Sequence, residues 1–166
     1  MDPNQAPKVL IRNEFKPGDM GTLIHLHGIL YAGEHGFDHT FEAYVAVPMA
    51  EFVRSGSLRQ RIWIAAVGDE VKGSLAIAEY ATDVAQLRWF LLHPDLRGKG
   101  LGKQLVGQAV SFCREQKYRT IFLWTVSELH AAAAIYRAAG FHLCESRKVK
   151  QWGRDLQEDR YELMLG

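Results

Sequence analysis

The stretch His93–Lys103, HPDLRGKGLGK, is the feature that most restricts what this chain can fold into. It places Gly98, Gly100 and Gly102 between an apolar run, residues 85–92, and an amphipathic segment, residues 101–116. A helix that starts on glycines presents unpaired N–H groups and the positive end of its dipole, with no Cβ to keep a ligand away. Phosphates bind at such helix starts. The loop therefore predicts a phosphate-bearing ligand, and a ligand-free glycine turn is the alternative.

Two familiar phosphate-binding motifs fit this loop poorly. A P-loop, G-x-x-x-x-G-K-[ST], would need glycine where Arg97 stands and serine or threonine where Gln104 stands. The dinucleotide motif G-x-G-x-x-G matches Gly98 and Gly100 but meets Lys103 at its third glycine. The first motif is excluded and the second is only weakly supported.

The hydrophobic pattern along the rest of the chain predicts an α+β fold, with strands and helices that alternate in its middle part. Apolar residues recur at helical spacing from Leu23 to Tyr31 and from Phe41 to Val53, with a kink or a fresh helix start at Pro48. Strands are expected at 9–12, 61–67, 72–80, 85–92, 120–126, 141–149 and 160–165, and later helices at 101–116 and 128–139. A loop, QWGRDLQ, is expected between the last two strands. We expect a single domain over residues 1–166, with residues 1–7 as a flexible tail.

Composition narrows the functional classes. The 20 basic residues against 19 acidic residues give a net charge of +1, which argues against nucleic acid or a membrane surface as a partner. Cys113 and Cys144 have no metal-ligand spacing and suggest a reducing compartment. His35 and His39 are four residues apart, but Gly36 weakens a helix there and no third ligand is evident, so no metal is expected. Without a leader-like or spanning apolar run, we expect a cytoplasmic protein.

Two motifs give the chain a family resemblance. Arg97-x-x-Gly100-x-Gly102 after a strand resembles the acetyl-CoA signature of the GNAT superfamily of N-acetyltransferases. IYRAAGFHL, residues 135–143, resembles the helix of that family that ends in Y-x-x-x-G-F. Residues 21–46 also resemble the acetyltransferase half of MarR–GNAT fusion regulators.

The resemblance implies a GNAT fold, with a central mixed sheet of about six or seven strands splayed between the fourth and fifth and about four helices. Residues 85–92 and 120–126 would be the splayed pair. It also implies acetyl-CoA as the acetyl donor, with its pantetheine arm pairing with the backbone of Phe90, Leu91 and Leu92. The pyrophosphate would lie on the amides of the loop, formed by Arg97, Gly98, Lys99, Gly100, Leu101, Gly102 and Lys103.

Acyl transfer to an amine needs a neutral amine, a donor for the oxyanion and a proton for the departing thiolate. A backbone N–H of Leu91 or Leu92, freed by the splay, is the expected oxyanion donor. By resemblance, Tyr136 protonates the sulfur of coenzyme A, and a packing role is the alternative.

The general base that would take the proton of the amine is less clearly indicated by the sequence than the acid. Some GNAT relatives use a glutamate on the strand before the loop, where this chain has Gln86 and Arg88. Glu79, near the end of the preceding strand, is the candidate base, and a solvated carboxylate is the alternative.

The acceptor site is expected between the first two helices, which wall it in GNAT folds. Tyr31 and Glu42 are candidate substrate-binding residues, because aromatic faces and carboxylates suit a cationic amine. His27 on the same wall and Trp124 at the end of the second splayed strand are further candidates. A packing or surface role is the alternative for each.

These features predict an N-acetyltransferase that moves an acetyl group from acetyl-CoA to a primary amine of a small molecule or peptide by direct attack. A non-catalytic acyl-CoA-binding or regulatory module is one alternative. An acetyltransferase for protein lysines or N-termini is another, and it would need an open acidic groove instead of a closed pocket. A homodimer is expected only by analogy with GNAT relatives.

Overall fold

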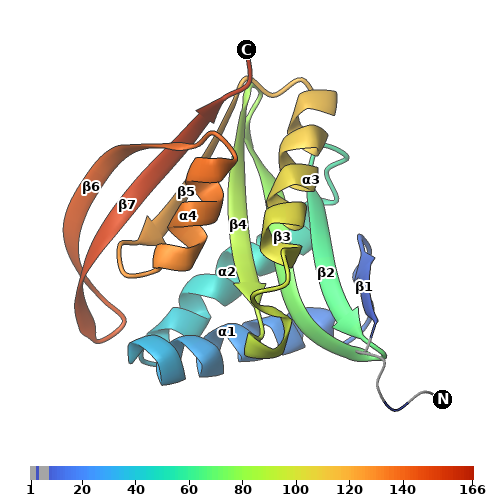
Figure 1. Ribbon diagram of the computed structural model, residues 1–166, viewed down its shortest axis with the longest axis vertical. Helices are drawn as coiled ribbons and strands as arrows, with labels where there is room; N and C mark the ends of the chain where they lie inside the picture. Colours follow the sequence, from blue (N-terminus) through green and yellow to red (C-terminus); the bar gives the residue numbers. More distant parts are fainter. Residues whose placement is uncertain (1–2, 4–7) are drawn as a thin grey trace.

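The computed structural model of the chain describes residues 3 and 8–166 and contains a seven-stranded sheet with helices on both faces (Figure 1). The strands, in the order β1-β2-β3-β4-β5-β7-β6 across the sheet, are β1 Val9–Arg12, β2 Arg61–Val67, β3 Glu70–Ala81, β4 Val84–Leu92, β5 Thr120–Val126, β7 Arg154–Met164 and β6 His142–Gln151. The helices are α1 Asp19–His35, α2 Thr40–Ser55, α3 Leu101–Glu115 and α4 His130–Ala138, with a short 3-10 helix at Pro94–Leu96. The predicted tail, residues 1–7, lies outside the described residues except for Pro3.

The sheet opens between its fourth and fifth strands. Neighbouring strands are antiparallel except for β4 and β5, which are parallel. These two strands pair only through residues 84–86 and 120–122 and then diverge toward the lower half of Figure 1. The predicted GNAT fold, with its mixed sheet and its splay between the fourth and fifth strands, is confirmed.

A β-bulge in β4 lies where the splay opens. Trp89 and Phe90 together stand opposite a single residue of β3, Leu75. Trp89 has a left-handed backbone conformation with φ of 49°, which is strained for a bulky side chain. The hydroxyl of Ser74 stabilises this conformation by donating to the carbonyl oxygen of Trp89 at 2.7 Å. A bulge bends its strand, and here it helps β4 to turn away from β5.

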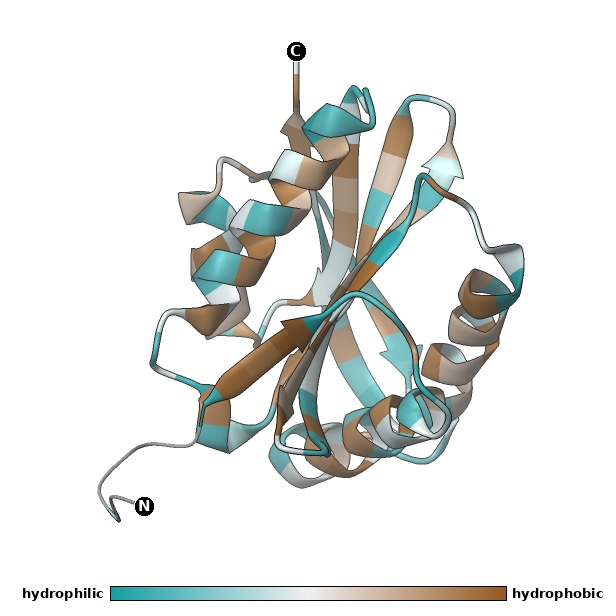
Figure 2. Ribbon diagram, turned by 90° about the vertical axis from the view of Figure 1, so that its right-hand side faces the viewer, coloured by the Kyte–Doolittle hydropathy of each residue, from teal (hydrophilic) through white to brown (hydrophobic). Residues whose placement is uncertain are grey.

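Two hydrophobic cores lie on opposite faces of the sheet. The first packs α3 and α4 against the sheet and includes the fully buried Leu105 and Tyr161. The second packs α1 and α2 against the other face and includes Leu23 and Met49. Figure 2 shows the helices flanking the sheet on both sides. Each helix pair is therefore anchored to the sheet through its own buried apolar side chains.

The prediction for the end of the chain is wrong in one respect, because QWGRDLQ is not a loop. Strand β7 begins at Arg154 and pairs with β6 from that residue onward, around a tight turn at Trp152 and Gly153. Both turn residues have positive φ, 53° and 79°, as a two-residue hairpin turn that matches strand twist requires. The first part of β7 is polar, so its composition imitates a loop although its backbone is fully paired. Because β6 and β7 pair right up to the turn, the sheet fixes the position of Trp152 and Gly153.

The first two helices are continuous. Helix α2 runs through Pro48 without the fresh start that the sequence suggested. A buried face that includes Phe41, Met49 and Phe52 holds the helix together across the missing N–H. In the part of the chain that the structure describes, no helix is both long enough and apolar enough to cross a membrane.

Candidate active site

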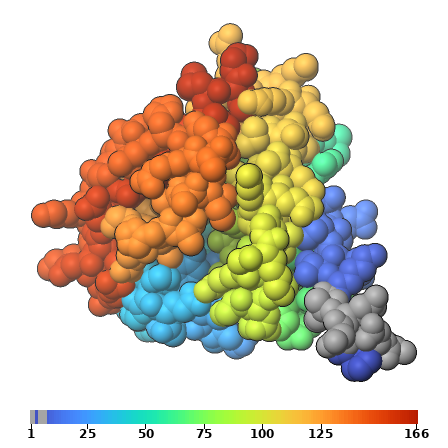
Figure 3. Space-filling model, in the orientation of Figure 1, coloured from blue at the N-terminus to red at the C-terminus, as the bar shows by residue number. Residues whose placement is uncertain are grey.

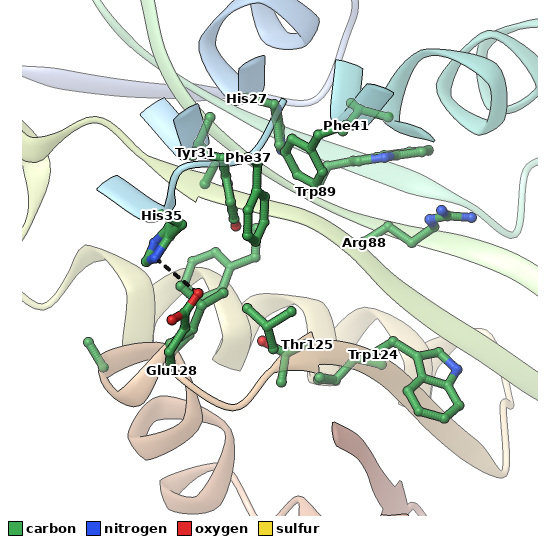
Figure 4. Close-up of a pocket in the computed structure, with 18 of the residues that line it drawn as sticks. His27, Tyr31, His35, Phe37, Phe41, Arg88, Trp89, Trp124, Thr125 and Glu128 are labelled. Carbon is green, nitrogen blue, oxygen red and sulfur yellow. Dashed lines mark ion pairs between the residues drawn. The ribbon is translucent and has the colours of Figure 1, made fainter. Parts of the chain in front are cut away.

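A cavity of about 470 Å³ occupies the gap between β4 and β5. Its walls come from α1, α2 and their connecting loop on one face of the sheet and from the start of α4 on the other. Figure 3 shows the surface hollowed between α4, in orange, and the yellow-green turn that precedes α3. Figure 4 shows the side chains that line the cavity. The cavity thus has walls on both faces of the sheet.

The glycine-rich loop lies beside this cavity, which Arg97 lines. Helix α3 begins after Gly100, whose φ is 80°, and no side chain caps its first turn. The N–H groups of an uncapped first turn lack partners and lie at the positive end of the helix dipole. Gly102 is needed for a different reason, because a Cβ there would lie 3.0 Å from side-chain atoms of both Ile135 and Phe90. Glycine therefore lets the start of α3 approach α4 and β4 closely.

The side chain of Arg97 braces the loop. Its Nε donates to the carbonyl oxygen of Leu92 at 2.9 Å, and its two terminal nitrogens donate to the carboxylate of Glu34 in α1 at 2.8 and 3.2 Å. Because the guanidinium is engaged in these contacts, an anion at the loop would be bound by backbone amides rather than by the side chain of Arg97.

Tyr136 of α4 lines the cavity and is 5% exposed. Its ring centre lies 5.9 Å from that of Phe90 and 6.0 Å from that of Phe141. Burial raises the pKa of the Tyr136 hydroxyl well above its usual range, because a phenolate would lose its hydration there. Tyr136 is therefore a neutral proton donor throughout the physiological pH range.

His27 of α1 also lines the cavity and is 3% exposed. Its Nδ1 lies 2.7 Å from the carbonyl oxygen of Leu23. A carbonyl only accepts, so Nδ1 carries the proton. Nε2 has no partner among the described residues, and burial lowers the pKa of His27 to about 4. At neutral pH the ring is therefore uncharged, with a lone pair on Nε2.

Aromatic rings line the part of the cavity that is formed by α1 and α2. The ring centres of Tyr31, Phe37 and Phe41 lie 4.6 to 5.6 Å apart. The indole of Trp152, from the hairpin turn, lies 5.0 Å from Phe37, 4.9 Å from Phe41 and 5.0 Å from Tyr44. We call these five residues the aromatic end of the cavity.

Two further carboxylates line the cavity, and each pairs with an arginine. Glu128 accepts a hydrogen bond from Arg154 at 2.5 Å and lies 3.7 Å from His35, the ion pair dashed in Figure 4. Glu158 of β7 is buried and pairs with Arg147 at 2.8 Å. Among residues 3 and 8–166, no three histidine, cysteine or acidic side chains gather as a metal site requires.

The structure brings three of the four predicted substrate-binding residues to the cavity, namely His27, Tyr31 and Trp124. Glu42 is not among the lining residues: it is exposed on α2, and its carboxylate lies over Gly28 of α1. The predicted cofactor-binding residues that line the cavity are Phe90, Leu91, Leu92, Arg97 and Tyr136, and the others lie in the adjacent loop.

Glu79, the predicted base, lies elsewhere. Its carboxylate is 3.6 Å from Arg59 and accepts a hydrogen bond from the hydroxyl of Ser57. It does not line the cavity, so the structure separates the predicted base from the predicted acid.

Sequence reasoning missed Arg88, Glu128, Trp152 and Glu158 as lining residues. Trp152 and Glu158 were hidden by the expectation of a loop before β7. The available signal was the pair Trp152-Gly153, because a residue followed by glycine between two strand-like segments favours a two-residue hairpin turn.

Comparison with known proteins agrees with this geometry. The model of the acetyltransferase (GNAT) family matches residues 29–141, which is more than half of the chain. The chain therefore belongs to the GNAT family.

Individual relatives match shorter segments. The chain is 33% identical over 82 residues to the uncharacterized N-acetyltransferase YjgM of Escherichia coli, covering 48% of this chain and 49% of that protein. It is 32% identical over 72 residues to the uncharacterized N-acetyltransferase MJ1207 of Methanocaldococcus jannaschii, covering 43% of this chain and 31% of that one. The matched part thus spans half the length or less of these curated relatives.

The solved structure of yncA from Salmonella typhimurium with its cofactor acetyl-CoA has the same fold, with a TM-score of 0.72 and 18% identity over 95% of this chain and 94% of that one. The closer likeness to MarR–GNAT regulators is not shown by these relatives and stays a prediction.

Proposed function

We propose that the protein transfers an acetyl group from acetyl-CoA to the primary amine of a small molecule, by direct attack of the amine on the thioester. The observation that supports this most strongly is the cavity at the splay, which joins an uncapped glycine-rich helix start to an aromatic end across the sheet. Membership of an acetyltransferase family and the acetyl-CoA bound by yncA support the same donor.

In this proposal, acetyl-CoA extends from the glycine-rich loop toward the aromatic end of the cavity. Its pyrophosphate would lie on the amides of residues 97–103, where the first turn of α3 is uncapped. Its pantetheine arm would follow β4 along Phe90 and Leu91, where β5 has turned away and left one side of β4 without a strand partner. The acetyl group would then lie at the bulge, between Tyr136 and the aromatic end.

The reaction follows from this placement. The amine nitrogen forms a bond to the carbonyl carbon, and the N–H of Leu91 or Leu92 stabilises the oxyanion of the tetrahedral intermediate. The intermediate collapses with cleavage of the carbon–sulfur bond, and the Tyr136 hydroxyl gives its proton to the departing thiolate. The nitrogen loses its extra proton to water, and the Tyr136 phenolate takes up a proton from water, which restores its hydroxyl. The products are an amide and free coenzyme A.

His27 has a positioning role in this proposal. Its pKa of about 4 makes it a weak base, so it does not hold the proton of an ammonium group. Its unpaired Nε2 lone pair instead accepts a hydrogen bond from the neutral amine and holds the nitrogen toward the thioester. Neither Glu79 nor Glu42 has a part in the reaction, since neither lines the cavity.

A small molecule as the acceptor is supported by the hairpin turn, whose Trp152 packs on Phe37 and Phe41 at the aromatic end. The backbone N–H of Asp38 donates to the carbonyl oxygen of Trp152 at 2.9 Å, and Arg154 donates to the carbonyl oxygen of His35 at 2.7 Å. These contacts fasten the β6–β7 turn to the α1–α2 loop over the aromatic end. A protein lysine or N-terminus would need an open groove at this place.

A thiol-release assay with acetyl-CoA tests the proposal. We expect turnover with small primary amines and none above background with peptides that present a lysine or N-terminal amine. Binding of acetyl-CoA without thiol release from any amine would instead identify a non-catalytic acyl-CoA-binding module. Faster turnover of peptides than of small amines would identify a protein acetyltransferase.

A further inference from the structure

Arg88 of β4 is a cation in the acceptor part of the cavity that the proposed chemistry does not use. It lines the cavity next to the bulge, and its guanidinium carbon lies 5.1 Å from the centre of the Trp89 ring. Figure 4 shows it extending toward the same end of the pocket as Trp124. It makes no ion pair with any residue that the structure describes.

The other arginines around the cavity each have a carboxylate partner. Arg97 is paired with Glu34, Arg147 with Glu158 and Arg154 with Glu128, all at 2.8 Å or less. These pairs are complete within the protein, so they offer no free charge to a ligand. Of the two arginines that line the cavity in the described structure, Arg88 is the one without a carboxylate partner.

The surroundings of Arg88 disfavour an unpaired charge. Burial lowers the pKa of its guanidinium, and nearby Tyr44 and Glu51 only partly oppose this effect. Glu51 is exposed and forms no ion pair with Arg88. A partly desolvated guanidinium without a carboxylate is unfavourable unless a ligand supplies one, and its planar fork matches a carboxylate in two parallel hydrogen bonds.

On the basis of the proposed function, we propose that the acceptor is an amino acid with a free carboxylate and an apolar or aromatic side chain, and that Arg88 binds the carboxylate. The side chain of the acceptor packs on the aromatic end, against rings such as Tyr44 and Trp152. The amine lies between these two contacts, beside the bulge where the thioester is placed. Arg88 thereby selects acceptors by charge and the aromatic end selects them by shape.

Matched acceptors test this with the unaltered protein. L-phenylalanine, L-leucine and L-methionine are compared with their carboxamides and with the decarboxylated amines in the thiol-release assay. The amides and amines keep the nucleophile and the side chain but lose the carboxylate. We expect kcat/KM for the acids to exceed that for the matched amides by about 10- to 150-fold, the range for one hydrogen bond to a charged group.

A variant pair tests the assignment to Arg88. In Arg88→Gln we expect the ratio of kcat/KM for the acids to kcat/KM for the matched amides to fall to about one, as follows from the loss of a contact to a charged group. Arg88→Lys keeps the charge and should retain part of the preference. Arg61→Gln is the matched control, because Arg61 also lies on a strand and stacks over a ring, 4.5 Å from Phe112, and forms no ion pair with a described residue, but does not line the cavity.

The outcomes separate this inference from the proposed function. Acetyl-CoA-dependent turnover of amides or amines at least as fast as the acids overturns the inference and leaves the proposed function standing. Binding of acetyl-CoA with no turnover of any of the three amino acids also overturns the inference. A preference for acids that survives Arg88→Gln means that another group binds the carboxylate. Absence of acetyl-CoA binding overturns the proposed function itself.

Discussion

At the scale of single residues, the proposed site depends on two buried groups that are both uncharged at neutral pH. Burial keeps Tyr136 protonated and keeps His27 uncharged at neutral pH. The first can donate a proton and the second can accept a hydrogen bond. The protonation of Tyr136 follows from the ordinary pKa of a phenol, whereas the lowered pKa of His27 cannot be deduced from residue type because it arises from desolvation in the finished fold.

Replacement of Tyr136 by phenylalanine tests the acid. The variant keeps the ring that packs beside Phe90 but removes the only proton that Tyr136 can give. We expect kcat to fall by about 10²- to 10⁴-fold, the usual contribution of general acid catalysis. The dissociation constant for acetyl-CoA, measured by calorimetry, should change by less than about threefold on this reasoning. Unchanged kcat would mean that the thiolate leaves without this proton.

The pKa of His27 predicts how stability depends on pH. Because the pKa of about 4 in the folded protein lies below the value of 6.5 for an ordinary histidine, the unfolded chain binds more protons between these two values. The stability is therefore complete above about pH 6.5 and declines as pH falls toward about 4. We expect a loss of about 2 kcal/mol between pH 7 and pH 5 from this group, measured by urea unfolding.

The control uses a second histidine on the same helix. His27→Phe should remove this part of the pH dependence, whereas His25→Phe should leave it in place because His25 is exposed. Equal pH profiles for the two variants would contradict the assignment to His27.

At the scale of elements, the bulge in β4 is the feature on which the donor site depends. It needs a glycine on the neighbouring strand, because a Cβ on Gly73 would lie 2.6 Å from the carbonyl oxygen of Leu91. A backbone atom cannot move aside as a flexible side chain can. Gly73 therefore fixes how closely β4 and β3 approach where the pantetheine arm is proposed to bind.

Gly73→Ala should displace β4 at Leu91. We expect the free energy of unfolding to fall by about 1–3 kcal/mol, as for other overpacked positions, and the affinity for acetyl-CoA to fall by about tenfold. Gly107→Ala on α3 is the control, since no described atom outside its own stretch of helix lies within 4 Å of the added Cβ and alanine favours a helix. Retained affinity for acetyl-CoA in Gly73→Ala would show that the bulge does not position the donor.

The elements themselves were largely predictable, and the exceptions have a common cause. Strands at residues 61–67 and 120–126 were predicted with their observed bounds, because apolar runs between turn residues mark buried strands clearly. The first half of β7 was missed because its side chains are polar and its pairing partners are distant in the sequence. The same limit applies to the site. The glycine loop and Tyr136 belong to local motifs, whereas Arg88 and Glu158 come to the cavity only through the tertiary fold.

At the scale of the whole molecule, the hairpin at the end of the chain completes a cavity that begins with the first helix. Trp152 packs on Phe37 of the α1–α2 loop and on Phe41 of α2, and this contact joins the first two helices to the last hairpin of the sheet. Loss of the contact should open the aromatic end without affecting the donor part. A homodimer, expected by analogy alone, stays a prediction.

Trp152→Gly isolates this role, because glycine accepts the positive φ of 53° while removing the indole. We expect KM for the small acceptor to rise by about tenfold or more, as expected for the loss of a large aromatic contact. The dissociation constant for acetyl-CoA should be unchanged. A rise in both constants would mean that the hairpin supports the whole cavity and not the acceptor end alone.

The most direct test of the central claim is calorimetric titration of the protein with acetyl-CoA, with NAD and ATP as phosphate-bearing controls. We predict one site per chain with a dissociation constant in the micromolar range for acetyl-CoA and no comparable heat from the controls. Equal binding of all three would show that the loop holds phosphates without recognising the donor. No binding of acetyl-CoA would contradict the proposed site and the chemistry that rests on it.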